Sequence, residues 1–304
     1  MRPMLATRGT HVPTGDDWTH EVKWDGMRVL VDTRDRVRLT SRNENDVSVS
    51  FPELQALPAE DVLLDGEVVA FGDGIPTFGA LADRMHVSNP RRAAALATTN
   101  PVTLLVFDLL RYGGRDLSRL PLAERREILL GLDLNDDRWQ TPPAYDDGPM
   151  LFDATKQQGL EGIVSKRRDS RYEFGARTRN WLKFAHRRRN SYVVGGWRPE
   201  TGSQTRLGAL LVGEPTPDGL VYRGRVGSGI AGKVGPVLQA ALAPHARESS
   251  PFVDEVPKLD ALGTNWVEPV MVVDVEALGL TPQRRLRQPS YRGVRTDLGP
   301  EDLT

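Results

Sequence analysis

The sequence predicts an α+β protein of two domains, in which antiparallel sheets with flanking helices are followed by a small β-barrel. Three observations support this fold class. At 304 residues the chain is long for one domain. Before residue 188, apolar strand-like runs alternate with helix-like segments. From about Ser191, short strands are separated by glycine and proline turns, which is typical of small barrels. We therefore expect domains at 1–188 and 189–304.

The first predicted elements are the strands of the N-terminal domain. Residues 27–41 hold two β-branched runs around the polar stretch TRDR, which predicts a hairpin. Residues 61–71 form an apolar, β-branched run, and residues 101–114 have the pattern of a buried strand that leads into a glycine turn. Shorter strands are expected further on, at EGIVSKRR (161–168) and NWLKFAH (180–186).

The other predicted elements are helices between these strands and the strands of the barrel. Helical spacing of apolar residues occurs in TFGALADRM (77–85), PRRAAALATT (90–99) and PLAERREILLGL (121–132). The last segment opens with Pro121, and proline suits the first turn of a helix. Barrel strands are expected at YVVGGW (192–197), LGALLVGE (207–214), LVYRGRVGSG (220–229) and TNWVEPVMVVDVEAL (264–278).

The composition excludes several classes of site and location. There is no cysteine, so disulfides, thiolate zinc sites and cysteine nucleophiles are ruled out together. No apolar run reaches the length that a membrane-spanning helix needs, and the N-terminus lacks the apolar stretch of a secretory signal. We therefore expect a cytoplasmic protein that has no membrane partner.

The charge is unevenly distributed along the chain. The net charge of −1 indicates no particular partner, but residues 166–189 hold ten lysines and arginines against two acids. An ordinary solvated face is one interpretation of such a block. The alternative is an ordered basic surface for a phosphate-rich partner, because aromatic residues are interleaved with the charges. These aromatic residues are Tyr172, Phe174, Trp181 and Phe184.

An ordered series of polar residues occupies positions where packed strands prefer apolar ones. It begins with the tetrapeptide K-W-D-G at Lys23. Taken alone, this tetrapeptide predicts only a turn with a solvated lysine, because Asp and Gly tolerate positive φ. The order of the whole series is far more specific: Lys23-Trp-Asp25-Gly26, Arg28, Arg42, Asp65-Gly66-Glu67, Phe107-Asp108, Glu161-Gly162, Lys166 and Lys183.

This series resembles the signature of the nucleotidyltransferase superfamily, which contains ATP-dependent DNA ligases, RNA ligases and mRNA capping enzymes. The resemblance is closest to bacterial ATP-dependent DNA ligases of the end-joining type, through the phrases PMLAT, EVKWDGMR and LRQPSYRGVRTD. It covers nearly the whole chain. It implies an ATP-grasp-like adenylation domain at 1–188, an OB-fold domain at 189–304, and a monomer associated with the nucleoid.

The activity that the resemblance implies is ATP-dependent ligation of nicks or ends in duplex DNA. A lysine attacks the α-phosphate of ATP to form lysine–AMP, the AMP moves to the 5′-phosphate of a nick, and the neighbouring 3′-hydroxyl then expels it. Phosphoryl transfer of this kind depends on positioning, metal ions and positive charge around the phosphates. ATP and Mg²⁺ or Mn²⁺ are the implied cofactors, and DNA end-joining or repair proteins are the implied partners.

The resemblance also assigns roles to individual residues. Lys23 would be the nucleophile, and neighbouring cations or a metal ion would favour the neutral amine that it needs. The remaining roles are Glu21 for the adenine amino group, Val22 beside the nucleotide, Arg28 and Arg42 for sugar and phosphate, Phe107 for stacking on the base, Lys166 and Lys183 for phosphate, Glu67 and Glu161 for ribose and metal, and Arg295 and Asp297 for pyrophosphate during self-adenylation.

Several residues in the same stretches have structural interpretations. Phe107 lies in an apolar strand, where an aromatic side chain commonly belongs to the core. We expect Asp25 and Asp65 to hold turns rather than a metal ion. Trp24 and Trp181 are expected to pack rather than to contact a ligand.

Two positions depart from the family pattern. The motif K-x-K ends here in Ala185, so part of the phosphate-binding charge is missing or is supplied by Arg187 or Lys166. The C-terminal motif R-x-D-K ends in Leu298, and the lost lysine puts strong ATP-driven self-adenylation in doubt.

Two other functions remain open at this point. An RNA ligase or a capping guanylyltransferase would share the K-x-D-G core, although Glu21 and the ending LRQPSYRGVRTD favour a DNA ligase. The alternative of another class is a catalytically weak nucleic-acid-binding homologue, which the departures at Ala185 and Leu298 keep open. An NAD-dependent ligase is disfavoured because those enzymes carry a four-cysteine zinc module.

Overall fold

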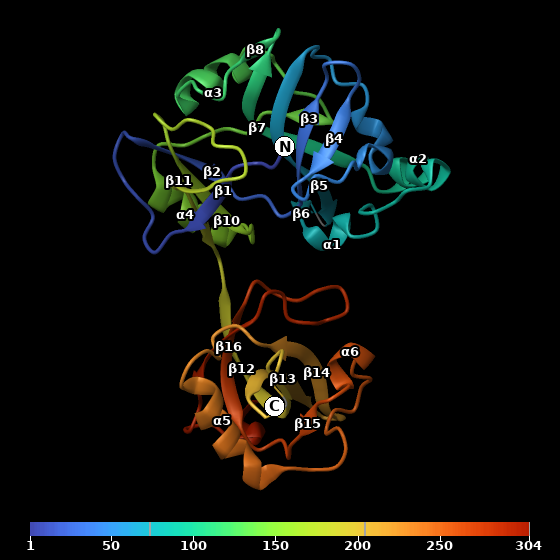
Figure 1. Cartoon of the computed structure of the whole chain (residues 1–304), viewed down its shortest axis with the longest axis vertical. Helices are drawn as coiled ribbons and strands as arrows, with labels where there is room; N and C mark the ends of the chain where they lie inside the picture. Colours follow the sequence, from blue (N-terminus) through green and yellow to red (C-terminus); the bar gives the residue numbers. More distant parts are fainter. Residues whose placement is uncertain (73, 204, 304) are drawn as a thin grey trace. The chain divides into compact units, whose positions relative to one another are not determined.

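The computed structural model describes residues 1–72, 74–203 and 205–303. The chain forms two compact units, Met1–His186 (the N-terminal unit) and Arg187–Thr304 (the C-terminal unit), both drawn in Figure 1. It passes from one to the other between His186 and Arg187, whereas the sequence predicted the boundary after residue 188. Within the described ranges, no helix is long and apolar enough to cross a membrane.

The N-terminal unit is built around a large sheet in which the strands pair in the order β4-β3-β5-β7-β8, with β6 on β5 and β9 on β7. The pairs are antiparallel, apart from β7 with β9, which run parallel. The hairpin predicted at 27–41 and the strands predicted at 61–71 and 101–114 are confirmed. The bounds are β3 Met27–Asp32, β4 Arg38–Ser41, β5 Val62–Gly72, β6 Ile75–Pro76, β7 Val102–Tyr112, β8 Arg115–Asp116 and β9 Trp139–Gln140.

A smaller sheet in the same unit has the strand order β1-β11-β10-β2. Its central pair, β10 and β11, confirms the two short strands predicted at 161–168 and 180–186, and the neighbouring β2 leads directly into Lys23. β1 runs parallel to β11. The bounds are β1 Leu5–Arg8, β2 Trp18–Val22, β10 Gly162–Arg167 and β11 Arg177–Ala185.

Two helices of the N-terminal unit, Pro90–Thr99 and Gly148–Gln157, begin at residues whose side chains cap them. Asn89 accepts hydrogen bonds from the backbone N–H groups of Arg91 and Arg92, and Asp147 accepts one from Met150. Pro121 directly precedes its helix instead of occupying the first turn, which corrects the prediction. The bounds are η1 Ser48–Ser50, η2 Pro52–Leu54, α1 Phe78–Leu81, α2 Pro90–Thr99, α3 Leu122–Leu130 and α4 Gly148–Gln157, of which the 3-10 helices and α4 were not predicted.

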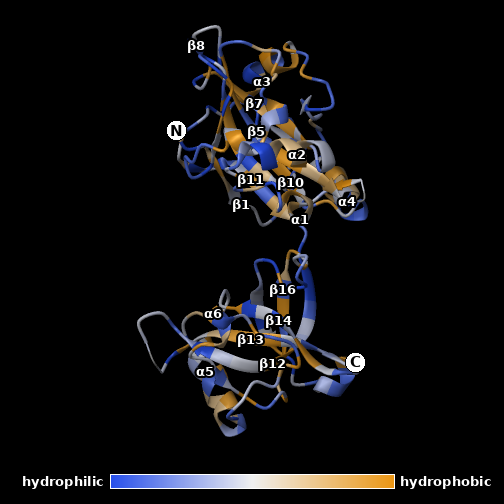
Figure 2. Cartoon of the chain, turned by 90° about the vertical axis from the view of Figure 1, so that its right-hand side faces the viewer, coloured by the Kyte–Doolittle hydropathy of each residue, from blue (hydrophilic) through white to orange (hydrophobic). Residues whose placement is uncertain are grey.

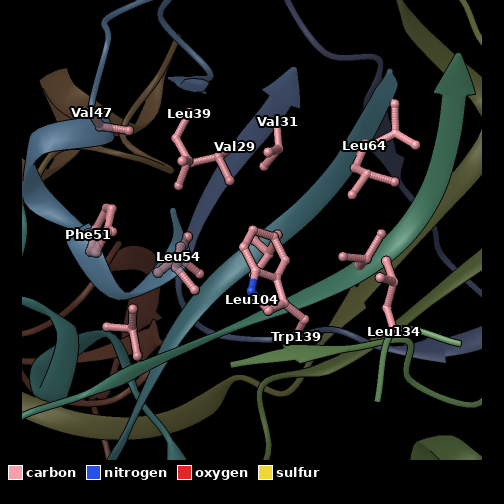
Figure 3. Close-up of a cluster of buried hydrophobic side chains, with 14 of the residues drawn as sticks. Val29, Val31, Leu39, Val47, Phe51, Leu54, Leu64, Leu104, Leu134 and Trp139 are labelled. Carbon is pink, nitrogen blue, oxygen red and sulfur yellow. The ribbon is translucent and has the colours of Figure 1, made fainter. Parts of the chain in front are cut away.

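Strand alternation gives the large sheet two different faces. Val29 and Val31 of β3 have no exposed surface and belong to the main core with Leu104 (Figure 3). Because successive side chains of a strand point to opposite faces, Leu30 packs on the other side, in a cluster with Trp181 of the smaller sheet. The two sheets therefore meet at this second face, where the pocket described below lies.

The C-terminal unit is an antiparallel sheet with strand order β14-β13-β12-β16-β17, with β15 on β12. A bridge between Ser228 and Ser290 links the segment after β14 to β17. The long strand expected at 264–278 is split into β15 and β16, since Pro269 cannot donate to a ladder. The bounds are β12 Arg188–Pro199, β13 Leu207–Thr216, β14 Gly219–Val226, α5 Val234–Leu242, η3 Ala243–His245, α6 Lys258–Ala261, β15 Asn265–Trp266, β16 Val272–Ala277, β17 Ser290–Val294 and η4 Pro300–Leu303.

Hydrophobic residues concentrate on the strands in Figure 2, and in the C-terminal unit they form two clusters on opposite faces of the curved sheet. Val194 and Val212 belong to one cluster together with Leu238 of α5, a helix that the sequence did not predict. Val193 and Leu211 belong to the other. Neighbouring residues of one strand thus serve different cores, as the period of two requires.

Candidate active site

One pocket of the N-terminal unit is lined by both sheets. Every residue predicted to bind the nucleotide contributes to its wall, and so does Lys23. Glu161 reaches the same place through Lys23, because the two side chains form an ion pair. Residues from eight strands or their ends meet here, and they are Leu5, Ala6, Glu21, Val22, Lys23, Trp24, Arg28, Arg42, Glu67, Phe107, Val164, Lys166, Arg177, Trp181 and Lys183.

Lys23 lies in the turn that follows β2. Its backbone N–H donates to the carbonyl of Gly162 at 2.8 Å, and its Nζ donates to Glu161 Oε2 at 2.6 Å. The lysine side chain is 24% exposed and that of Glu161 is 12% exposed, so the pair is accessible from the pocket but shielded from bulk solvent. Lys23 is therefore not a solvated strand residue.

The rest of the K-W-D-G turn is fixed by close packing. A Cβ on Gly26 would lie 2.2 Å from the carbonyl oxygen of Val68 in β5, so no side chain fits there. Asp25 Oδ2 accepts a hydrogen bond from the N–H of Phe78 at the start of α1, which agrees with the structural role expected of it. The turn is thus anchored to β5 and to α1.

Two carboxylates lie next to the lysine. Desolvation in the pocket raises the pKa of Glu67 to about 8, the nearby cations Lys23 and Arg28 lower it in part, and the negative charge of Glu161 raises it. Glu161 precedes Gly162, which has a φ of +140° and would place a Cβ 2.0 Å from the carbonyl oxygen of Phe184. That close approach to β11 holds Glu161 in place beside Lys23.

Glu21 and Lys166 form a second, buried ion pair. Lys166 Nζ donates to Glu21 Oε2 at 2.6 Å, and Arg126 Nη1 of α3 donates to Glu21 Oε1 at 3.2 Å. Burial lowers the pKa of Lys166, although the negative charges of Glu21 and Asp108 act in the opposite direction. Sequence reasoning missed Arg126, because a single arginine in an amphipathic helix carries no signal of its contact 105 residues away.

Aromatic rings form the neighbouring wall. The rings of Phe107 and Trp181 meet edge to face with centroids 6.2 Å apart, and Lys166 Nζ lies 4.5 Å and 4.3 Å from these centroids. Phe107 is partly buried and lines the pocket, so it is not a pure core residue. Trp24 and Trp181 were expected only to pack, but both contribute to the pocket wall.

Arg28 is held by Asp65 of β5. Its Nε donates to Asp65 Oδ1 at 2.9 Å and its Nη2 to Oδ2 at 2.5 Å, while the Tyr172 hydroxyl also donates to Oδ2 at 2.6 Å. Burial opposes the charge of Arg28, but Asp65 outweighs it and raises the pKa of Arg28. The expectation that Asp65 holds a turn was therefore wrong, since it lies inside a strand and orients Arg28.

Three further cations gather at one end of the pocket. Desolvation lowers the pKa of Lys183, and the positive charges of Lys23, Arg177 and Arg42 lower it further. Arg42 directly follows β4, the second strand of the hairpin. Sequence reasoning did not single out Arg177, although it and Lys183 have the same parity in β11 and so share a face.

Lys166 and Arg187, the two residues predicted as sources of the charge missing at Ala185, both have ionic partners. Lys166 is 2% exposed and is engaged with Glu21. Arg187 donates to the carbonyl of Gln288 and pairs with Glu276, all within the C-terminal unit. Arg177 is the additional cation that lines the pocket.

The basic block 166–189 is not a surface of interleaved aromatics. Tyr172, Trp181 and Phe184 are all buried, at 4%, 2% and 7% exposure, and Phe174 alone among the four predicted aromatics is exposed. The prediction failed because these three aromatic side chains pack into the hydrophobic clusters of the N-terminal unit, Tyr172 and Trp181 in one and Phe184 in another.

The C-terminal motif residues lie together in the C-terminal unit. Arg295 forms a two-pronged ion pair with Asp297, at 2.8 Å and 2.7 Å, and hydrogen bonding from Arg295 lowers the pKa of Asp297 to about 2. Leu298, which stands where the family has lysine, packs against a hydrophobic cluster that includes Val193 and Leu211.

Comparison with known proteins identifies the family. The family profile described as "ATP dependent DNA ligase domain" matches residues 3–185, more than half of the 304-residue chain, and the profile "ATP dependent DNA ligase C terminal region" matches residues 203–298. The chain belongs to the ATP-dependent DNA ligase family. The family and the fold class predicted from the sequence are therefore confirmed.

Individual members of the family are similar over the whole of this ligase chain. It is 38% identical to the multifunctional non-homologous end joining DNA repair protein LigD of Mycobacterium tuberculosis, over 100% of this chain and 39% of that protein. It is 31% identical to LigD of Pseudomonas aeruginosa, over 99% of this chain and 36% of that protein. The chain thus spans less than half the length of these relatives.

Solved structures of DNA ligases share the fold. The structure described as mycobacterial DNA ligase D complexed with ATP and MES has 36% identity and a TM-score of 0.57, and the match covers 100% of this chain and 97% of that one. The ligase domain of M. tuberculosis LigD has 36% identity and a TM-score of 0.56 over the same shares of the two chains.

Proposed function

We propose that this chain is an ATP-dependent ligase that seals nicks or joins ends in duplex DNA through a lysine–AMP intermediate. The observation that carries the proposal is the placement of the Lys23 amine, which lies in a pocket beside a carboxylate, an aromatic wall and a group of cations. These are the groups that phosphoryl transfer from ATP to an amine requires.

In the first step Lys23 Nζ attacks the α-phosphorus of ATP. A phosphorus–nitrogen bond forms, the bond to pyrophosphate breaks, and the ammonium proton passes to Glu161, whose Oε2 lies 2.6 Å from Nζ. Lys183, Arg177 and Arg42 surround the phosphates and stabilise the charge that develops on them. At this end of the pocket the transition state is therefore stabilised by electrostatic attraction between the cations and the phosphates.

The adenosine end of the nucleotide occupies the aromatic part of the pocket. The base stacks on Phe107, an arrangement worth about 1–3 kcal/mol per base in nucleic-acid-binding proteins. Glu21 accepts from the amino group of adenine, and Val22 lies beside the nucleotide. Arg28, held by Asp65, contacts the sugar.

Glu67 and Glu161 are the residues that would hold Mg²⁺ or Mn²⁺. Desolvation raises the pKa of Glu67 to about 8, and a cation bound beside it would favour the charged carboxylate. Two carboxylates are sufficient, because Mg²⁺ keeps several waters and takes its other ligands from substrate phosphates. When bound, the metal supplies charge that neutralises the phosphate oxygens.

The later steps act on DNA. AMP passes from Lys23 to the 5′-phosphate of the nick, and the 3′-hydroxyl then attacks that phosphate and expels AMP, so the phosphate ends in a phosphodiester. Arg295 and Asp297 would orient pyrophosphate in the first step. The names of the relatives support end joining as the pathway, with end-joining or repair proteins as partners and the nucleoid as the location.

Mass spectrometry after incubation with ATP and Mg²⁺ tests the proposal directly. The wild type gains the mass of one AMP on Lys23, and Lys23→Ala gains none, because no other amine in the pocket is paired with Glu161 at this distance. Lys156→Ala is the matched control, since that lysine is exposed at the end of α4 and its labelling stays at the wild-type level. Full labelling of Lys23→Ala refutes the assignment.

The alternatives that the sequence left open are separated by substrate. An RNA ligase would seal nicked RNA in preference to DNA, and a capping guanylyltransferase would take up GMP; membership of the DNA ligase family speaks against both. A catalytically weak homologue would bind nicked DNA without gaining AMP. A single assay with labelled ATP, labelled GTP and both nicked substrates distinguishes these functions.

A further inference from the structure

Arg126 lies outside the residues that the proposed reaction uses, yet it reaches the wall of the nucleotide pocket. From α3 its Nη1 donates to Glu21 Oε1 at 3.2 Å, and its Nη2 donates to the carbonyl of Pro142. The side chain is 11% exposed and that of Glu21 is 6% exposed, so the ion pair is shielded from solvent. A buried charge pair of this kind is costly to break, because one partner would be left uncompensated.

The two oxygens of Glu21 are divided between two cations. Arg126 donates to Oε1, and Lys166 Nζ donates to Oε2 at 2.6 Å. A carboxylate held from both sides has one orientation. Each of its oxygens has a second acceptor site, so the group can still accept one more hydrogen bond from a ligand.

The same contacts place Glu21 next to the aromatic wall. Lys166 Nζ, which touches Glu21, is 4.5 Å from the centre of the Phe107 ring. A base stacked on Phe107 therefore brings its polar edge within reach of the Glu21 carboxylate. The charged group that this edge meets decides which base is accepted.

We propose that Arg126 sets the purine specificity of this pocket by holding Glu21 in the orientation that accepts from a 6-amino purine. An ionised carboxylate accepts hydrogen bonds and donates none. It therefore matches the 6-amino group of adenine and opposes the 6-oxo group of guanine. Arg126 touches neither base, so it is a positioning residue, and the inference rests on the proposed function because it requires a nucleotide in this pocket.

Removal of Arg126 weakens the discrimination in two ways. Glu21 Oε1 loses its donor, and the carboxylate is free to turn about its remaining contact with Lys166. Lys166 then becomes available to the base edge, and an ammonium group donates to a 6-oxo group as readily as a carboxylate accepts from an amino group. ATP loses a positioned acceptor and GTP gains a donor.

The test compares uptake of AMP and GMP by the full chain and by Arg126→Met. The preference for ATP over GTP, measured as the ratio of kcat/KM values for covalent nucleotide uptake, falls about tenfold or more in the variant, the size expected for one charged hydrogen bond. The change lies mainly in KM, because Arg126 acts on the base through Glu21 and not on the reacting amine. Equal loss with both nucleotides, or an unchanged ratio, overturns the proposal.

Arg168→Gln is the matched control. Arg168 lines the same side cavity as Arg126 and pairs with Asp146, but it does not contact Glu21, so the ATP preference stays at the wild-type value. In a Glu21→Gln background, Arg126→Met causes no further change in the ratio, because the group that it orients is already altered; an additive change contradicts the proposal.

Two further outcomes are informative. If Arg126→Met does not fold, Arg126→Lys decides the question: a lysine reaches one of the two partners, so the ATP preference falls while the charge is retained, and an unchanged preference overturns the proposal. A wild-type chain that takes up neither nucleotide overturns the proposed function and this inference together. If the wild type takes up nucleotide but Arg126→Met leaves the ratio of kcat/KM values for ATP and GTP unchanged, only this inference is overturned.

Discussion

At the scale of single residues, three ion pairs of the pocket join residues far apart in the sequence. Lys23 is paired with Glu161, Glu21 with Lys166, and Arg28 with Asp65. Glu67 differs, because desolvation raises its pKa to about 8. The pKa of Glu67 therefore depends on the solvent access and on the charges of the pocket.

The pH dependence of stability follows from Glu67. Its pKa rises from 4.5 to about 8 on folding, so the folded state keeps a proton that the unfolded chain loses between these values. The stabilising contribution is complete below pH 4.5 and is lost as the pH rises to about 8. Urea unfolding without divalent metal should show that Glu67→Gln gains stability relative to the wild type as pH rises through this window. Parallel pH profiles for the two proteins would contradict it.

At the scale of elements, the reactive turn is held in place by close backbone packing. Gly26 lies against β5 and Gly162 against β11, and in both places a Cβ would meet a carbonyl oxygen. The glycines of the motifs D-G and E-G therefore allow the strand ends to approach closely. The positions of Lys23 and Glu161 depend on that approach.

Gly26→Ala tests this role. The added Cβ forces the turn away from Val68, so we expect a loss of about 1–3 kcal/mol in unfolding free energy, typical of overpacking. Because Lys23 moves with the turn, AMP uptake should also fall at least tenfold. Gly72→Ala at the end of β5 is the control, since its Cβ would make ordinary contacts at 3.5 Å or more. An unfolding free energy and an AMP uptake equal to those of the wild type in Gly26→Ala would contradict this role of Gly26.

At the scale of the whole molecule, a net charge of −1 conceals a local excess of positive charge. Within 166–189, Lys166 and three of the four aromatic residues are buried, and exposed arginines remain on the surface. Arg171 and Arg179 are exposed, and neither has an ion-pair partner among the residues that the structure describes. We predict that both contact DNA phosphates.

The salt dependence of nick binding tests that surface. Each phosphate contact contributes a slope of about −0.9 in a plot of log K against log salt for duplex DNA. Arg171→Gln and Arg179→Gln should each make the slope shallower by about that amount. Arg36→Gln, in the turn of the 27–41 hairpin, is an exposed control whose slope should equal that of the wild type. Identical slopes for all variants would mean that the block is an ordinary solvated face.

The sequence was informative where the signal is local or ordered along the chain. The strands at 61–71 and 101–114 were predictable because a short run of branched apolar residues is typical of a buried strand. The site residues were predictable as an ordered series that resembles a known signature. The helix α4 and the split of the strand at 264–278 were missed, because capping by Asp147 and the interruption at Pro269 are weak signals beside hydrophobic patterning.

By itself the sequence determined the family, the fold class, and which residue types gather around Lys23. Only the tertiary structure decided their pairing: that Asp65 holds Arg28, that Arg126 and Lys166 share Glu21, and that the aromatics of the basic block face inward. The physical reason is that strand periodicity and turn chemistry act over a few residues, whereas these ion pairs join positions 37 to 145 residues apart. Such contacts form only when sheets distant along the chain pack face to face.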